Sequence, residues 1–331
     1  MQFTTAIELP NNFVKITHKS KIMLAGSCFA ENIGNKLAER KFDIDINPFG
    51  ILYNPLSIGK MLEKVISGEI FTAASPEIFE HNDKWHSILH HGDFSCDTKD
   101  GLLSQINRRL TEAHKRIQKC DALIVTFGTA YVYTRNSDDC IAGNCHKLPG
   151  NMFTRKLLSV DEIVASTTEI TKKLLAANPN VKIIFTVSPI RHLRDGAHDN
   201  QKSKATLLLA IDRIMQQFPE VAFYFPAYEI MLDELRDYRF YAADMTHPSP
   251  VAVDYIWELW SKCCFDSETT RLNEDIEDVN RALAHRPFDP EADSYKKFIQ
   301  KTLGKIETLN KKSPSLDLKN EITICNTLLN R

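Results

Sequence analysis

The sequence predicts an α/β protein, built as a three-layer α/β/α sandwich around a mostly parallel, five-stranded sheet. Three features of the chain lead to this prediction. Short apolar runs such as residues 121–127 (DALIVTF) and 181–187 (VKIIFTV) are nearly continuous, as in strands that are buried on both faces. Amphipathic helical patterns separate these runs. The distances between successive runs are too long for hairpins, so the strands are expected to pair in parallel.

The first strand and the first helix meet in residues 21–34 (KIMLAGSCFAENIG). An apolar run, residues 22–25, leads into a turn of small residues that begins with Gly26, and a helical pattern follows. Glycine adopts backbone conformations in such a turn that other residues avoid. The free N–H groups and the positive dipole end of the helix would stabilise a Cys28 thiolate, or an oxyanion beside Ser27 or Cys28. The alternative is that the turn serves packing alone.

The remaining elements continue the alternation of strands and helices. Ser159 and Glu162 have the spacing of a capping box, which predicts a helix start. Residues 69–100 and 131–153 show no periodicity and are expected to be irregular, the first of them as a lid, a binding loop or surface decoration. Helices are expected at residues 29–40, 56–66, 103–119, 160–177, 203–218, 227–236 and before residue 264, and further strands at residues 42–46, 121–127, 181–187 and 221–225.

The length and composition are those of a globular protein. With 331 residues, of which 43% are hydrophobic, the chain can bury one large core or two modest ones. The formal net charge of −2 comes from 41 basic and 43 acidic residues that are interspersed, so neither nucleic acid nor a membrane is an expected partner. The N-terminus has no basic segment followed by an apolar core. The eight scattered cysteines fit reduced thiols, and a cytoplasmic location is therefore expected.

Two parts of unequal size are expected in the chain. Residues 1–265 contain every predicted strand and would form the domain of the sheet. Residues 266–331 are charged and helical with only a light apolar stripe, so they are expected to pack as a C-terminal helical extension. Such an extension also offers a surface for a homodimer.

Small residues follow several of the predicted strands. Gly26, Gly50, Gly128 and Ser188 each stand at or just after the C-terminal end of a strand. Ligands of parallel α/β sheets bind at this edge. The sequence therefore predicts a site at the carboxyl ends of the strands.

Asp244 and His247 stand three residues apart, just before the last helix of the sheet domain. A carboxylate at this spacing can hydrogen-bond one imidazole nitrogen, fix the tautomer and leave the other nitrogen free as a general base. Ordinary turns contain the same pattern. The pair is thus a hypothesis about catalysis that depends on what else lies at the same edge of the sheet.

The chain has a nucleophile turn near its start, then two glycine turns and then an Asp-x-x-His-Pro string. This order resembles the sequence blocks of the SGNH, or GDSL-type, hydrolases. Within that clan, the string Gly26-Ser27-Cys28-Phe29-Ala30 spells the motif after which the GSCFA-domain family is named. The resemblance covers roughly residues 1–265 and includes the strings NPFG (47–50), FGT (127–129), SPIRH (188–192) and DMTHPS (244–249). It implies a flavodoxin-like sheet and a serine-type esterase or acyl-transfer site that works without a metal or an organic cofactor.

The resemblance also implies roles for individual residues. His247 would be the base and Asp244 its orienting acid. Gly50 would match the backbone oxyanion donor of the second block. Gly128, followed by Thr129, would match the glycine of the third block.

The nucleophile is open between Ser27 and Cys28. A strict overlay on the Gly-Asp-Ser of the GDSL pattern puts Cys28 on the nucleophile, whereas a shift by one residue restores Ser27 but puts Ala25 on the glycine. A Cys28 thiolate at a helix start beside an imidazole would be the better nucleophile. A buried cysteine can equally be inert packing.

A second departure from the GDSL pattern concerns the oxyanion. The third block usually carries an asparagine that donates to the oxyanion, and this chain has Ala130 instead. Losing one such donor typically costs about 100- to 1000-fold in rate. Asn144 and His146 are the nearest residues that would substitute. Arg191 and His192 follow the fourth strand and would hold a substrate carboxylate or phosphate, or else lie in a solvated loop.

Three hypotheses about function follow. The first is an SGNH-like hydrolase that cleaves an ester, or transfers an acyl group, on a polar small molecule or carbohydrate. The second is a catalytically silent module that keeps the pocket and binds a ligand. The third is a thiol enzyme that uses Cys28 as nucleophile and His247 as base.

Overall fold

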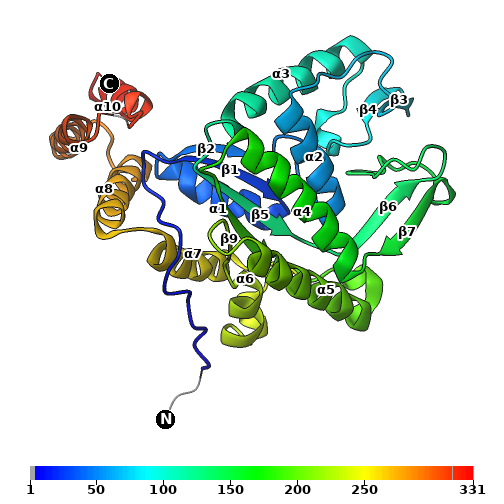
Figure 1. The fold of residues 1–331 in the computed structure, drawn as a ribbon. Helices are drawn as coiled ribbons and strands as arrows, with labels where there is room; N and C mark the ends of the chain where they lie inside the picture. Colours follow the sequence, from blue (N-terminus) through cyan, green and yellow to red (C-terminus); the bar gives the residue numbers. More distant parts are fainter. Residues whose placement is uncertain (1–3, 315, 331) are drawn as a thin grey trace.

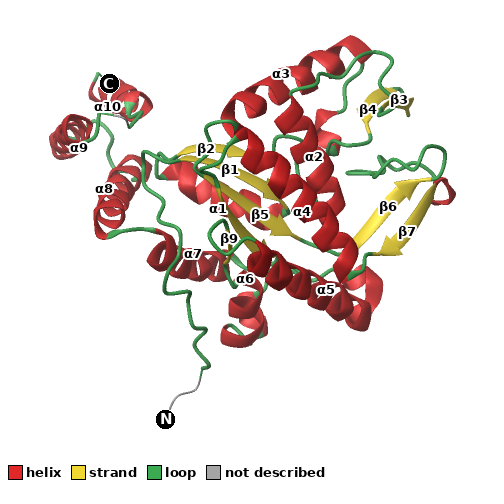
Figure 2. Cartoon of the chain, viewed as in Figure 1, coloured by secondary structure: helices red, strands yellow, loops and turns green. Residues whose placement is uncertain are grey.

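The computed structural model, which describes residues 4–314 and 316–330, is an α/β/α sandwich around a parallel sheet of five strands (Figure 1, Figure 2). This confirms the predicted fold class. The strands lie in the order β2-β1-β5-β8-β9, and each neighbouring pair is parallel. They are β1 (Lys21–Gly26), β2 (Asp43–Ile46), β5 (Ala122–Phe127), β8 (Lys182–Val187) and β9 (Ala222–Tyr224).

Helices cover both faces of the sheet. One layer contains α2 (Pro55–Ser67), α3 (Lys99–Ile117), α4 (Val160–Ala177) and α5 (Gly196–Gln217), and the other contains α1 (Cys28–Glu39), α6 (Ala227–Glu229) and α7 (Pro250–Cys264). Side chains along β1 alternate between the two cores. Met23 and Ala25 belong to the core of the first layer, whereas Ile22 and Leu24 belong to the core of the second. This period of two is what strand geometry requires.

Some helix ends follow the local sequence signals and others do not. Ser159 and Glu162 form the predicted capping box at α4, because Ser159 Oγ accepts the Glu162 N–H at 3.2 Å and Glu162 Oε2 accepts the Ser159 N–H at 2.9 Å. Helix α5 begins at Gly196, before the expected start at residue 203. Its first turns are polar and show no apolar period, so the sequence pattern did not reveal them. The helix expected at residues 227–236 is the short α6 followed by a π-helical turn, Ile230–Glu234.

Two segments that were expected to be irregular each contribute to an antiparallel hairpin. Strand β3 (Ile78–His81) pairs with β4 (Lys84–Ser87), and β6 (Tyr131–Arg135) pairs with β7 (Phe153–Leu157). The prediction for residues 69–100 and 131–153 was wrong in this respect, because strands of four or five residues are too short to show a period. Figure 1 shows both hairpins on the side of the sheet opposite the C-terminal helices.

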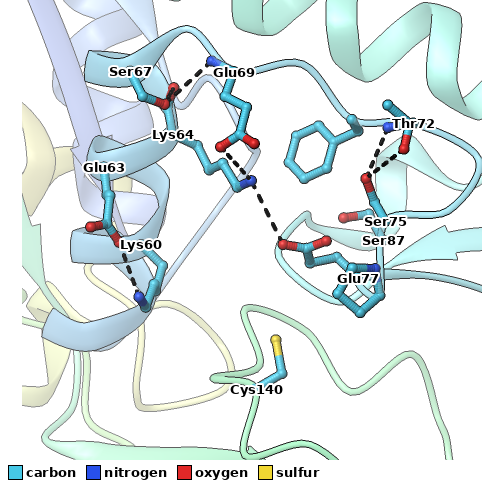
Figure 3. A network of polar contacts seen from close by, with 12 residues as sticks. Lys60, Glu63, Lys64, Ser67, Glu69, Thr72, Ser75, Glu77, Ser87 and Cys140 are labelled. Atoms are coloured by element: carbon cyan, nitrogen blue, oxygen red, sulfur yellow. Dashed lines mark hydrogen bonds and ion pairs between the residues drawn. The ribbon is translucent and has the colours of Figure 1, made fainter.

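A network of polar contacts holds the segment before β3 on the end of α2 (Figure 3). Lys64 Nζ lies 3.6 Å from Glu69 Oε2 and 3.8 Å from Glu77 Oε1, and 5.1 Å from the centre of the Phe71 ring. Ser67 Oγ accepts the N–H of Glu69 at 3.3 Å. These contacts fix the path of the chain from α2 to the first hairpin.

Three helices follow the sheet domain: α8 (Ser267–Ala284), α9 (Asp293–Lys312) and α10 (Lys319–Leu329). They share a small hydrophobic core of their own. Lys41, just after α1, pairs with Glu321 of α10 at 2.6 Å, and Arg40 pairs with Glu277 of α8. The division at residue 265 and a homodimer through these helices stay predictions. None of the helices in the described ranges combines the length and apolar character of a membrane span.

Candidate active site

A cavity of about 440 Å³ opens at the carboxyl ends of the central strands. Its lining includes Ser27 after β1, Thr129 after β5 and Ser188 after β8. His247, from the loop before α7, also lines it. The parallel sheet therefore brings residues from four distant parts of the chain to one edge, which is where such sheets bind ligands.

The turn between β1 and α1 places Ser27 and Cys28 at this cavity. Ser27 is the N-cap of α1, and its Oγ accepts the N–H of Phe29 at 3.3 Å. Cys28 is the first residue of the helix, and its Sγ lies 3.9 Å from the Tyr53 hydroxyl. Gly26 has φ +138°, and a Cβ there would lie 2.2 Å from the Thr126 carbonyl oxygen. Only glycine fits, so this turn can bring β1 close to β5.

Asp244 and His247 form the expected pair. His247 Nδ1 lies 2.5 Å from Asp244 Oδ2, and the other carboxylate oxygen accepts the N–H groups of Thr246 and His247, both at 2.9 Å. These donors, with the His247 N–H first, hold the pKa of the Asp244 carboxyl well below its usual range. A charged carboxylate fixes the ring so that Nε2 is the nitrogen left for a substrate or a nucleophile. Both side chains are about half exposed.

The backbone N–H group that the resemblance suggested as oxyanion donor, that of Gly50, is bonded within the protein, as are those of the third block. Gly50 donates to the Asn47 carbonyl at 2.8 Å, and Gly50 does not line the cavity. Gly128 and Thr129 both donate to the Tyr53 carbonyl, at 2.7 and 3.0 Å. Donors to an oxyanion must therefore come from other groups.

Asn144 and His146, the candidates to replace the missing asparagine, are separated by the structure. Asn144 lines the cavity, and its Oδ1 accepts the N–H of His146 at 2.8 Å. His146 is buried outside the cavity lining, and its Nε2 bonds to the Ser87 carbonyl at 2.9 Å. The His146 ring is thus part of the packing under the first hairpin.

His192 also lines the cavity. Its Nε2 is buried and has no hydrogen-bond partner among the described residues. A Cβ added to Gly128 would lie 3.4 Å from this nitrogen, and the ring packs edge-on against Tyr53 with centroids 5.8 Å apart. The backbone N–H of His192 donates to Asn200 Oδ1 at 2.9 Å. Burial lowers the pKa of His192 to about 4, so the ring is neutral at pH 7.

Lys204 was missed by the sequence analysis. It is 1% exposed, and its Nζ donates to the carbonyls of Gly128 at 2.6 Å and Ser188 at 2.8 Å. Ser203 Oγ accepts the N–H of Ala130 at 2.8 Å. Helix α5 therefore holds the residues that follow β5 and β8 in place beneath the cavity. Burial lowers the pKa of Lys204 to about 7. The available signal was a lysine on the apolar face of a helix.

The fold and the site define a class of protein: a parallel α/β/α sandwich whose cavity at the carboxyl edge is lined by a helix-capping serine and by a histidine paired with an aspartate. Sequence comparison gives the particular family. The model of the GSCFA family matches residues 21–260, and that of the GSCFA domain protein, C-terminal domain, matches residues 276–331. The chain therefore belongs to the GSCFA family, as the resemblance implied.

No curated protein matches the chain. Among solved structures it is similar to an acetyl xylan esterase (Est2A) from the rumen bacterium Butyrivibrio proteoclasticus, with 13% sequence identity and a TM-score of 0.38. The match covers 75% of this chain and 65% of that one. A similarity of this size says nothing of activity or substrate.

Proposed function

We propose that the protein hydrolyses an acyl ester of a polar small molecule or carbohydrate, or transfers its acyl group, with Ser27 as nucleophile, His247 as base and Asp244 as orienting acid. The observation that carries this proposal is the His247–Asp244 hydrogen bond of 2.5 Å at a cavity that Ser27 also lines. An Asp-held imidazole with a hydroxyl at the same cavity is the arrangement that acyl transfer needs.

The steps follow from the hydrogen bonds of each group. Ser27 Oγ accepts a bond from the Phe29 N–H, so its own proton is not used in that bond, and we assign this proton to His247 Nε2. Attack of Oγ on the acyl carbon forms the tetrahedral intermediate, and the proton passes from His247 to the leaving alcohol as the ester bond breaks. A water, or a second alcohol, then gives its proton to His247 and attacks the acyl carbon of the acyl-Ser27 ester. His247 returns this proton to Ser27 Oγ as the acyl–Oγ bond breaks, which releases the acid or the new ester.

We assign two donors to the oxyanion. The N–H of Cys28 stands at the first position of α1, where no acceptor inside the helix is available and the helix dipole favours negative charge. His192 Nε2, which is unpartnered among the described residues, can donate in its Nε2–H tautomer. It would take the place of the asparagine that is absent at Ala130.

Replacing His192 with alanine should lower kcat about 100- to 1000-fold, because a preformed donor to the oxyanion is lost. The pKa of His192 is lowered to about 4, so the ring is neutral and the loss should be the same throughout pH 6–9. Steady-state kinetics across that range check this. His198→Ala changes an exposed histidine outside the cavity lining and is the control. A variant at His192 with kcat within about threefold of the wild type would contradict the role.

One observation favours a catalytically silent binding module instead. The N–H group of Gly50, the backbone donor that the resemblance implied, is bonded within the protein, and so are those of Gly128 and Thr129. The thiol-enzyme alternative would use Cys28 in place of Ser27. The polar atom beside Cys28 Sγ is the Tyr53 hydroxyl oxygen at 3.9 Å, as the Phe29 N–H at 3.3 Å is beside Ser27 Oγ.

A fluorophosphonate probe tests the proposed function directly. The expected result is one covalent adduct, placed on Ser27 by mass spectrometry, together with turnover of at least one member of a panel of short-chain and sugar acetyl esters. The Ser27→Ala variant should give neither. Absence of both adduct and turnover in the wild type would favour the binding module.

A further inference from the structure

The cavity lining carries an excess of positive charge. Arg155, Arg191 and Arg194 line it together with a single carboxylate, that of Asp195. Three positive charges and one negative charge leave a net charge of +2, on a chain whose formal net charge is −2. A cavity with low-dielectric walls and charges of one sign concentrates ligands of the opposite sign.

Arg155 is already engaged. Its guanidinium pairs with Asp195 at 2.5 Å, and its central carbon lies 3.7 Å from the centre of the Tyr131 ring. The ion pair joins β7 to the loop before α5. Asp195 therefore balances the charge of Arg155. Within the described ranges, the lining has no other carboxylate to balance the charges of Arg191 and Arg194.

Arg191 has an unfilled hydrogen-bonding position. Its Nε–H is buried and has no hydrogen-bond partner among the described residues. A buried guanidinium donor without a partner is unfavourable. A carboxylate or a phosphate presents two oxygens that match the guanidinium fork and would satisfy this donor.

Arg191 and His247 line the same cavity. Tyr241 forms a backbone bridge with Pro248, the residue after His247. The positive charge of Arg191 opposes the rise in the pKa of Tyr241 that burial causes. In the proposed mechanism His247 returns its proton to the leaving alcohol, so the alcohol part of the ester lies in the cavity that Arg191 lines.

We infer that the alcohol part of the substrate carries an anionic group, a carboxylate or a phosphate, which Arg191 binds. This inference rests on the proposed ester chemistry. It narrows the substrate class to acyl esters of hydroxy acids, acidic sugars or phosphorylated alcohols. Arg194 also lines the cavity, and its positive charge adds to the attraction of an anion.

Acetyl esters of 4-hydroxybenzoate and 4-hydroxybenzamide test the charge requirement, because they differ in charge and hardly in shape. The wild type should show a kcat/KM about 10- to 100-fold higher for the anionic ester, as a charge-assisted hydrogen bond provides. The acetyl ester of 4-hydroxyphenyl phosphate compares a phosphate with the carboxylate. The preference should weaken as ionic strength rises. In Arg191→Gln the ratio of the two kcat/KM values should fall close to one.

Arg236→Gln is the matched control, because Arg236 is an exposed arginine outside the cavity lining. It should keep the wild-type ratio. A wild-type ratio near one, or a ratio unchanged in Arg191→Gln, would overturn the inference while leaving ester hydrolysis standing. Should no ester be turned over, calorimetric titration with 4-hydroxybenzoate, 4-hydroxyphenyl phosphate and 4-hydroxybenzamide decides separately. Arg191-dependent binding of the anions supports the anion site, and equal binding of all three contradicts it.

Discussion

Replacing His247 with alanine is expected to lower kcat by about 10⁴- to 10⁶-fold with little change in stability. The imidazole both accepts the proton of Ser27 and returns it to the leaving alcohol, so its loss removes both proton transfers. The ring is half exposed and its pairing with Asp244 is local. The loss should therefore appear in turnover of any accepted ester and not in the urea midpoint. His285→Ala, which changes an exposed histidine at the end of α8, is the control.

Asp244→Asn provides an independent test of the same pair. An asparagine would still accept the N–H groups of Thr246 and His247, so the loop should keep its shape. Its amide N–H groups would face Nδ1 and favour the wrong tautomer, which should cost about 10⁴-fold in kcat. Near-normal turnover in either the His247 or the Asp244 variant would exclude this mechanism.

The parts of the fold that sequence could predict are those with a local cause. The apolar runs of β5 and β8 are buried on both faces, and Ser159 with Glu162 marks the start of α4 within four residues. The hairpins and the first turns of α5 were missed because their stability comes from contacts across the chain. Strand β7, for example, has exposed residues at its centre and is held by its pairing with β6.

The site shows the same division. The turn at Gly26 and the Asp244–His247 pair lie within short stretches of sequence, and their geometry could be expected from spacing. The bonding of the Gly128 and Thr129 N–H groups depends on the carbonyl of Tyr53, which no pattern around residue 128 reveals. The support from Lys204 likewise joins residues that are far apart in the chain. Long-range contacts of this kind decide which polar groups remain free for a ligand.

Exchanging Ser27 for glycine is expected to lower kcat by about 10⁶-fold, as removal of the nucleophile does in such sites. Glycine is chosen because Ser27 is also the N-cap of α1, and glycine at an N-cap costs only a few tenths of a kcal/mol, roughly, against about 1 kcal/mol for alanine. Ser159→Gly makes the same cap exchange on α4, at a residue outside the cavity lining, and controls for stability. Urea unfolding should show similar small changes for both variants, while only Ser27→Gly loses turnover.

Cys28→Ala completes the comparison of the two neighbouring residues. The thiol has only a hydroxyl at 3.9 Å as its polar neighbour, and alanine keeps the backbone N–H that we assign to the oxyanion. Turnover should therefore stay within about threefold of the wild type, the range of a substitution without a specific role. Iodoacetamide below pH 7 should leave activity unchanged, because a thiolate paired with an imidazolium is needed for fast alkylation there. The opposite pattern, with turnover lost in Cys28→Ala and kept in Ser27→Gly, would make the protein a Cys-His thiol enzyme.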